Sequence, residues 1–173
     1  MVVESVEQQT FSREFEQVFG EHHDIVYRTA YGVTGSVEDA EDVAQTIFLQ
    51  VLRREISVSS MKNPAGYLYR AAVNLSLTIV RSRARRASVT VETLASVPIL
   101  TPSRAEEQHR KLYEAIALLP SKMAEILILR YQHDFSDVEI ARMLGTSRGV
   151  IAVSLYRARA RLKNLLVSSS GGE

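Results

Sequence analysis

One stretch, residues 134–163, constrains the fold of this chain more than any other. It reads DFSDVEIARMLGTSRGVIAVSLYRARARLK and predicts a short helix, a tight turn and a second helix. Ser136 suits the N-cap of the first helix, and Glu139, three residues later, completes a capping box. Gly145 suits the left-handed position that ends a helix. This order of elements is that of a helix-turn-helix.

The second helix of this motif is amphipathic and basic. Thr146 or Ser147 can cap it. Its apolar stripe consists of Ile151, Leu155, Ala158, Leu162 and Leu165. The cations lie largely off that stripe; they are Arg148, Arg157, Arg159, Arg161 and Lys163. A basic second helix of this kind enters the DNA major groove. The alternative is a helical hairpin whose arginines only solvate the surface, because short patterns of this type also arise by chance.

Composition narrows the classes of protein that remain. The 173 residues include no cysteine, which excludes disulfides and thiolate metal sites and fits a reducing compartment. No apolar run approaches the ~20 residues of a membrane span. The acidic, polar N-terminus is unlike a signal peptide. These features predict a cytoplasmic protein without membrane insertion.

Motifs for catalysis are missing from the sequence. It contains no glycine-rich phosphate loop, nucleophile elbow or pair of catalytic carboxylates. His22 and His23 are adjacent, so on a helix they diverge and do not converge on a metal. We therefore expect no catalytic residue, no metal site and no cofactor.

The net charge of +1 conceals two halves of opposite sign. Residues 1–60 hold 11 acidic residues against 4 Lys and Arg, whereas residues 61–173 hold 9 against 17. Such a division indicates different partners for the two halves. The acidic half suits a basic protein surface, and the basic remainder suits phosphate.

The periodicity is helical almost throughout and predicts an all-α chain. Helices are expected at about 11–33, 37–54, 64–86, 105–118 and 121–132, before the helix-turn-helix. Residues 87–104 lack a helical period and hold two prolines. We therefore predict two small helical domains, residues 1–86 and 105–173, joined by a flexible linker at 87–104.

The third predicted helix has a polar face opposite its apolar stripe. This face carries Tyr67, Arg70, Asn74, Thr78, Arg81 and Arg85. Aromatic rings stack on unpaired bases and arginines bind phosphates, so the face suits single-stranded nucleic acid. The alternative is a solvated basic face.

An acidic cluster opens the second predicted helix, at residues 38–42. It either complements the helix dipole or forms a docking face in which Asp42, Gln45 and Leu49 project together.

Taken together, three stretches in order resemble bacterial RNA polymerase sigma factors of the extracytoplasmic-function group. Residues 35–54, GSVEDAEDVAQTIFLQVLRR, resemble the helix that docks on the polymerase clamp. Residues 63–86, NPAGYLYRAAVNLSLTIVRSRARR, resemble the helix that melts and reads the −10 element. Residues 118–162 resemble the −35-binding domain.

The resemblance implies promoter recognition with core RNA polymerase and promoter DNA as partners, an anti-sigma factor as a candidate partner, and no catalysis. It places the core-polymerase contact on Asp39, Asp42, Gln45, Phe48 and Leu49. It places the −10 contact on Lys62, Asn63, Tyr67, Arg70, Asn74, Arg81 and Arg85. It places the −35 contact on Ser147, Arg148, Ala152, Tyr156, Arg157 and Arg159. It also maps a base-capturing loop to about 55–63.

Departures from the family pattern occur at both DNA surfaces. Tyr67 stands where the family usually has tryptophan, and Thr78 where it usually has aspartate. Ala152, Val153 and Ser154 replace a common Lys, Ser and Arg, which predicts weak or unusual −35 recognition. Two alternatives remain: a stand-alone helix-turn-helix regulator, and a sigma-like decoy whose second domain no longer reads DNA.

Overall fold

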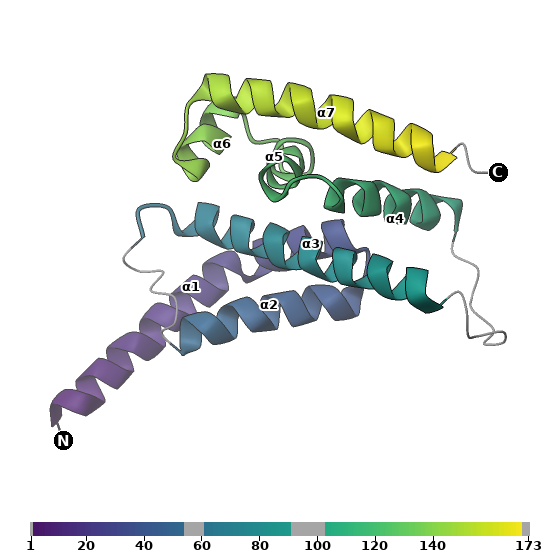
Figure 1. The fold of residues 1–173 in the computed structure, drawn as a ribbon. Coiled ribbons are helices and arrows are strands. Elements are labelled where there is room, and N and C mark those ends of the chain that lie inside the picture. The colour runs from purple at the N-terminus through teal and green to yellow at the C-terminus, as the bar shows by residue number, and fades with distance from the viewer. Residues whose placement is uncertain (1, 54–60, 91–102, 171–173) are drawn as a thin grey trace.

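In the computed structural model, the residues described are 2–53, 61–90 and 103–170, and within these ranges every regular element is an α-helix (Figure 1). The helices are α1 (Val2–Thr34), α2 (Val37–Leu52), α3 (Pro64–Thr90), α4 (Arg104–Ala117), α5 (Ser121–Tyr131), α6 (Asp137–Leu144) and α7 (Arg148–Ser170). This confirms the all-α prediction. None of the described helices is long and apolar enough to cross a membrane.

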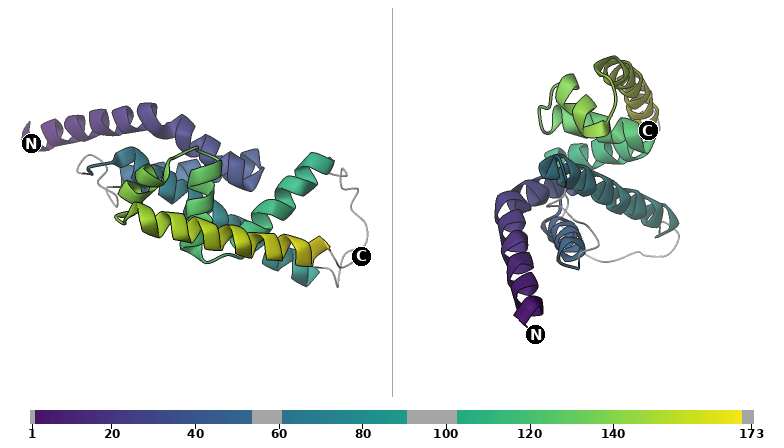
Figure 2. Two further views of the ribbon diagram at one scale, coloured as in Figure 1. Left: turned by 90° about the horizontal axis from the view of Figure 1, so that it is seen from above. Right: turned by 90° about the vertical axis from the view of Figure 1, so that its left-hand side faces the viewer.

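Helices α1, α2 and α3 form the first domain (Figures 1 and 2). Its core is made by Val26 and Ala30 of α1, several side chains of α2 including Ile47, and Leu68 and Ala72 of α3. Side-chain caps begin α2 and α3. The Ser36 hydroxyl accepts a hydrogen bond from the Asp39 amide, and the Asn63 side chain accepts one of 2.9 Å from the Gly66 amide.

Helices α4 to α7 form the second domain, and its helix-turn-helix follows the sequence prediction. Ser136 and Glu139 make both bonds of a capping box at the start of α6. Gly145 ends α6 with φ of 62°, in the left-handed region. The Ser147 hydroxyl accepts a hydrogen bond from the Val150 amide at the start of α7. Ile151, Leu155 and Ala158 are buried, as the predicted stripe requires.

The two domains are in contact through a shared apolar core. Tyr69, Val73, Leu77 and Val80 of α3 belong to the same cluster of buried residues as the interior of the second domain. In Figure 1, α5 is seen end-on between α3 below and α7 above. Helix α3 is therefore buried on two sides, one toward α1 and α2 and the other toward the second domain.

Two helices are longer than the sequence analysis predicted. Helix α1 begins at Val2, and α3 continues to Thr90, so the first four residues of the predicted linker are helical. No glycine or proline occurs in 2–10 or 87–90 to stop either helix. The linker positions 91–102 and residues 55–60 of the predicted base-capturing loop lie outside the described residues, whereas Ser103 caps α4 and Arg104 begins it.

The turn of the helix-turn-helix gives a stability prediction. Replacing Gly145 by alanine adds a Cβ at positive φ, and should destabilise the second domain by about 1 kcal/mol. The matched variant Gly149→Ala lies in α7, has open space around the added Cβ, and should stabilise the domain by about 0.5–1 kcal/mol. Urea denaturation of both variants measures the difference; equal shifts of the same sign would contradict the assignment of the turn.

Candidate protein and nucleic-acid interfaces

The polar face of α3 lies partly against the second domain. The Nε of Arg70 donates a 2.7 Å hydrogen bond to Oε1 of Glu125, and the Asn74 side-chain amide lies 3.4 Å from the same oxygen. Glu125 is almost fully buried in α5. Three turns further along α3, the Nε of Arg81 donates a 2.7 Å hydrogen bond to the carbonyl oxygen of Ala117. A buried carboxylate needs such partners, since its desolvation is otherwise costly.

The sequence analysis assigned this face to DNA and did not place it relative to the second domain; in this structure Arg70, Asn74 and Arg81 contact that domain. The reason is the neighbouring stripe of Val73, Leu77 and Val80, which is apolar and becomes buried against the second domain. Of the other predicted −10 residues, Lys62, Asn63 and Arg85 are exposed and Tyr67 is half-buried beside the first-domain core. Whether these side chains contact DNA stays a prediction.

A second set of contacts joins the end of α1 to the second domain. The side-chain amide of Gln132 donates to the carbonyl oxygen of Thr29 at 3.1 Å and accepts a hydrogen bond from the Tyr113 hydroxyl at 3.1 Å. His109 Nε2 lies 2.8 Å from the carbonyl oxygen of Gly32. A Cβ at Gly32 would clash with the end of the Gln132 side chain, so a larger residue there would require that side chain to move away from the Thr29 carbonyl oxygen.

An aromatic cluster containing His133 lies at the same interface. The ring of Tyr69 lies 4.7 Å from that of His133 and 5.0 Å from that of Phe135, between ring centres. Nε2 of His133 is buried and has no hydrogen-bond partner in the described part of the chain. Burial lowers the pKa of His133, and the nearby charge of Asp134 opposes that shift only in part. The cluster therefore favours neutral histidine.

This burial predicts a pH dependence. Because the folded pKa of His133 lies below its ordinary value of 6.5, the folded state is fully stabilised above pH 6.5 and loses stability as the pH falls through the folded pKa. Urea denaturation at pH 7.5 and 5.5 should show this loss. His133→Phe keeps an aromatic ring without a titrating group and should reduce the pH dependence; an unchanged pH dependence would contradict the role of His133.

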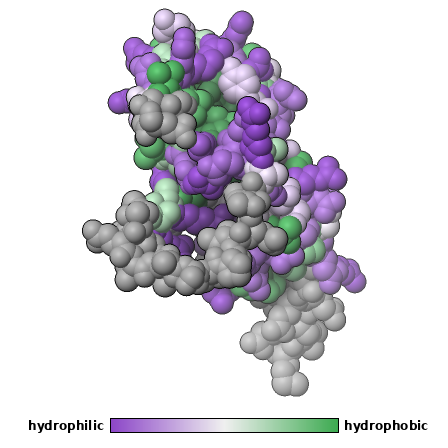
Figure 3. Space-filling model, turned by 90° about the vertical axis from the view of Figure 1, so that its right-hand side faces the viewer, coloured by the Kyte–Doolittle hydropathy of each residue, from purple (hydrophilic) through white to green (hydrophobic). Residues whose placement is uncertain are grey.

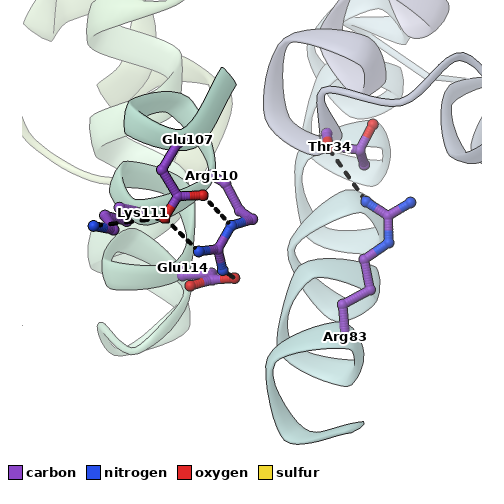
Figure 4. Close-up of polar contacts among 6 residues, drawn as sticks. All are labelled: Thr34, Arg83, Glu107, Arg110, Lys111 and Glu114. Atoms are coloured by element: carbon purple, nitrogen blue, oxygen red, sulfur yellow. Dashed lines mark hydrogen bonds and ion pairs between the residues drawn. The ribbon is translucent and has the colours of Figure 1, made fainter. Parts of the chain in front are cut away.

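The predicted core-polymerase residues separate into an exposed and an inner group. Asp42, Gln45 and Leu49 are exposed on α2. Phe48 is buried, with its ring 4.9 Å from that of Phe19. Asp39 pairs with Arg83 of α3, whose guanidinium also donates to the carbonyl oxygen of Thr34 (Figure 4). Because their side chains face other residues of the first domain, Phe48 and Asp39 present little surface to a partner, and whether this part of α2 binds the polymerase stays a prediction.

A groove of about 510 Å³ runs between α1 and α2 beside the exposed group. Its lining consists of Phe15, Phe19, His23, Tyr27, Glu41, Ala44, Gln45, Phe48, Leu49 and Leu52. Aromatic rings of α1 recur every four residues and contact one another along this groove. The sequence analysis placed no residue of the first helix in the docking surface. The fourfold spacing, continued by His23 and Tyr27, was the signal for a semi-exposed aromatic row.

The predicted −35 residues lie on the exposed side of α7 or directly before it. Ser147, Arg148, Ala152, Tyr156, Arg157 and Arg159 are all exposed. Arg159 also donates a 3.2 Å hydrogen bond to the Tyr131 hydroxyl, which orients its side chain. The opposite side of α7 is buried in the second domain. The exposed side of α7 is therefore free to approach a ligand in this structure.

The outer side of α4 carries an ion-pair network that no predicted site includes. Arg110 bonds to Glu107 and Glu114 at 2.7 Å, and Lys111 lies 3.5 Å from Glu107 (Figure 4). Such exposed pairs stabilise a helix only slightly. The face of the molecule in Figure 3 is mostly hydrophilic, with small apolar patches. We therefore assign this network to a small local stabilisation of α4 and to no binding site.

An acidic docking face, a basic and aromatic helix, and an exposed basic recognition helix define a two-domain, DNA-binding protein of all-α class. Two family descriptions match the chain: Sigma-70 region 2 over residues 18–86, and Sigma-70 region 4 over residues 109–162. The chain belongs to the extracytoplasmic-function group of RNA polymerase sigma factors.

Individual relatives agree with this family. The sigma factor SigE of Mycolicibacterium smegmatis is 30% identical over 164 residues, a match covering 90% of this chain and 63% of the relative. The sigma-E factor of Streptomyces antibioticus is 28% identical, with 88% of this chain and 84% of the relative covered. Among solved structures, the sigma factor RpoE of Bartonella quintana in complex with the anti-sigma factor NepR has a TM-score of 0.50 and 22% identity, covering 89% of this chain and 97% of that one. That likeness shows the fold.

Proposed function

We propose that this chain directs bacterial core RNA polymerase to specific promoters, with one surface for each of three tasks. The groove between α1 and α2 docks on the polymerase, the polar face of α3 melts and reads the −10 element, and α7 reads the −35 element. The observation that supports this most is the exposure of all six predicted −35 residues, five on α7 and Ser147 directly before it, in a chain whose first domain matches Sigma-70 region 2.

Charge supports the docking surface. Three acids, Glu38, Glu41 and Asp42, lie exposed on α2 near the groove, so a basic partner surface with apolar side chains is complementary to it. We propose no catalytic chemistry for this chain itself, since bond formation belongs to the polymerase. Because its partners are polymerase and chromosomal DNA, the proposed location is the cytoplasm.

The contacts between α3 and the second domain imply that the two domains must separate before α3 can bind DNA. Glu125 accepts hydrogen bonds from Arg70 and Asn74, and the carbonyl oxygen of Ala117 accepts one from Arg81. These three side chains are therefore not available to DNA while the domains are in contact. We propose that docking on polymerase separates the domains and uncovers the −10 surface. An anti-sigma factor is a further candidate partner, as one is bound to the similar solved structure.

Run-off transcription tests the function directly. Core polymerase should start at discrete new positions on a genomic fragment library when the full chain is added. The start sites should share two upstream elements. Core binding without new starts would favour the decoy alternative, and promoter binding without core binding would favour the stand-alone regulator.

A variant at the groove tests the docking surface. Leu49→Glu should lower the affinity for core polymerase about tenfold or more, because a charge replaces an apolar contact at the proposed interface. Leu112→Glu is the matched control: Leu112 of α4 has the same exposed fraction as Leu49, 37%, but lies outside the groove. Fluorescence anisotropy with core polymerase measures both; equal losses would place the docking surface elsewhere.

A further inference from the structure

The outward ridge of α7 is apolar where a recognition helix would meet bases. Val150 and Val153 are 52% and 50% exposed, and Ala152 between them is also exposed. The core-facing side of the same turns is occupied by Ile151 and Leu155, which are buried. Valine has a lower helix propensity than most residues, so neither folding nor helix formation explains two exposed valines here.

Cations flank this ridge on both sides. At 3.6 residues per turn, Arg148 and Arg159 lie along one flank and Arg161 lies along the other, while Arg157 continues the line of Val150 and Val153 toward the C-terminus. All four are exposed, and α7 contains no acidic residue. A ridge flanked by arginines fits a groove whose walls are phosphates, and favours nucleic acid over an apolar protein partner.

The chemistry of the ridge limits what it can read. Base edges in the major groove are distinguished by hydrogen bonds and by the C5 methyl group of thymine. The N-terminal turns of a recognition helix make the base contacts. Valine and alanine side chains neither donate nor accept hydrogen bonds, so the thymine methyl is the base-edge group they contact favourably.

We propose that Val150 and Val153 contact thymine methyl groups, so that apolar contact sets part of the −35 specificity of this chain. The proposal rests on the proposed function, in which α7 enters the major groove at the −35 element. It assigns a reading role to positions 150 and 153 and leaves hydrogen-bonded readout to Arg148, Tyr156 and Arg157.

Deoxyuridine provides the test, because it differs from thymidine only by the missing methyl group. The holoenzyme, reconstituted from the full chain and core polymerase, first selects its −35 element from a randomised promoter library. Each thymine of that element, on either strand, is then replaced by deoxyuridine. We expect binding to weaken about 3- to 5-fold at one or two positions.

A double-mutant cycle assigns the contact to the valine. Val153→Ala should weaken binding to the thymine promoter by a similar factor, and deoxyuridine at the contacted position should then add little further loss. Val167→Ala changes another exposed valine of α7, far from its N-terminal turns, and should leave the sensitivity to deoxyuridine intact.

Three results would overturn the proposal: a selected element without thymine, no position sensitive to deoxyuridine, or an undiminished sensitivity in both Val150→Ala and Val153→Ala. If the proposed promoter-directing function itself is wrong, the result is different: the unmodified chain would give no promoter-specific holoenzyme at all. That result would reject both proposals, whereas methyl-independent promoter binding would reject only this one.

Discussion

Replacing Glu125 by lysine should separate the two domains of the free chain. The carboxylate is buried in α5 and accepts hydrogen bonds from Arg70 and Asn74. Lysine would place a buried cation beside the partly exposed guanidinium of Arg70. Because the Arg70 side chain is 40% exposed and stays partly solvated, we expect a cost of about 2 kcal/mol, roughly a 30-fold shift toward separated domains.

The absence of natural cysteine makes this separation measurable. Dyes on Glu38→Cys in α2 and Asn164→Cys in α7, two exposed positions in different domains, report the interdomain distance by energy transfer. Glu125→Lys should lower the transfer efficiency, whereas Glu125→Gln keeps a hydrogen-bond acceptor and should lower it less. The charge-swapped pair Arg70→Glu with Glu125→Arg should restore part of it. Unchanged transfer in Glu125→Lys would show that this contact does not hold the domains together.

The separated form should also differ in DNA binding. If the contact with Glu125 covers the −10 surface, the free Glu125→Lys variant should bind a single-stranded −10 oligonucleotide about tenfold more tightly than the unmodified chain. Glu107→Lys makes the same charge change at a half-buried position of α4 that pairs with Arg110 of the same helix, and is the control for non-specific attraction of DNA. Equal gains in both variants would mean that net charge, and not uncovering, explains the effect.

Local features of this fold could be predicted from the sequence because their causes are local. The capping box of Ser136 and Glu139, the left-handed Gly145 and the cap at Asn63 each depend on residues within one turn of each other. The exposed −35 residues follow from the same periodicity. Each of these features can therefore be predicted from neighbouring residues alone.

The covering of α3 depends on residues distant in sequence and was missed. Arg70 and Glu125 are 55 positions apart, and nothing near Arg70 indicates that a carboxylate will face it. The sequence of α5 did contain a signal for this contact. Residues 124–129 are buried without interruption, and a helix that is apolar all round lies between other elements. A single acid within such a helix needs a partner, and the polar face of α3 supplies the cation.

Removing two of the three arginines of that face, Arg70 and Arg81, should lower both the interdomain energy transfer of the free chain and the promoter affinity of the holoenzyme. In the free chain, Arg70→Ala with Arg81→Ala deletes the bonds to Glu125 and Ala117 and should loosen the domain contact. In the holoenzyme the same change deletes two proposed phosphate contacts. We expect promoter affinity to fall about 30- to 100-fold for all −10 sequences, with the salt dependence of binding reduced by about two ions.

Circular dichroism separates loss of the DNA contact from general damage to the fold. A variant that merely unfolded would lose energy transfer and promoter binding together with its helical circular dichroism, which should here stay unchanged. Arg110→Ala with Lys111→Ala removes two exposed cations of α4 and controls for net charge; it should leave the salt dependence within about half an ion of the unmodified chain. If the α3 double variant instead loosens the domains but keeps full promoter affinity, Arg70 and Arg81 serve only the closed form, and the −10 contact must rest on the remaining predicted residues.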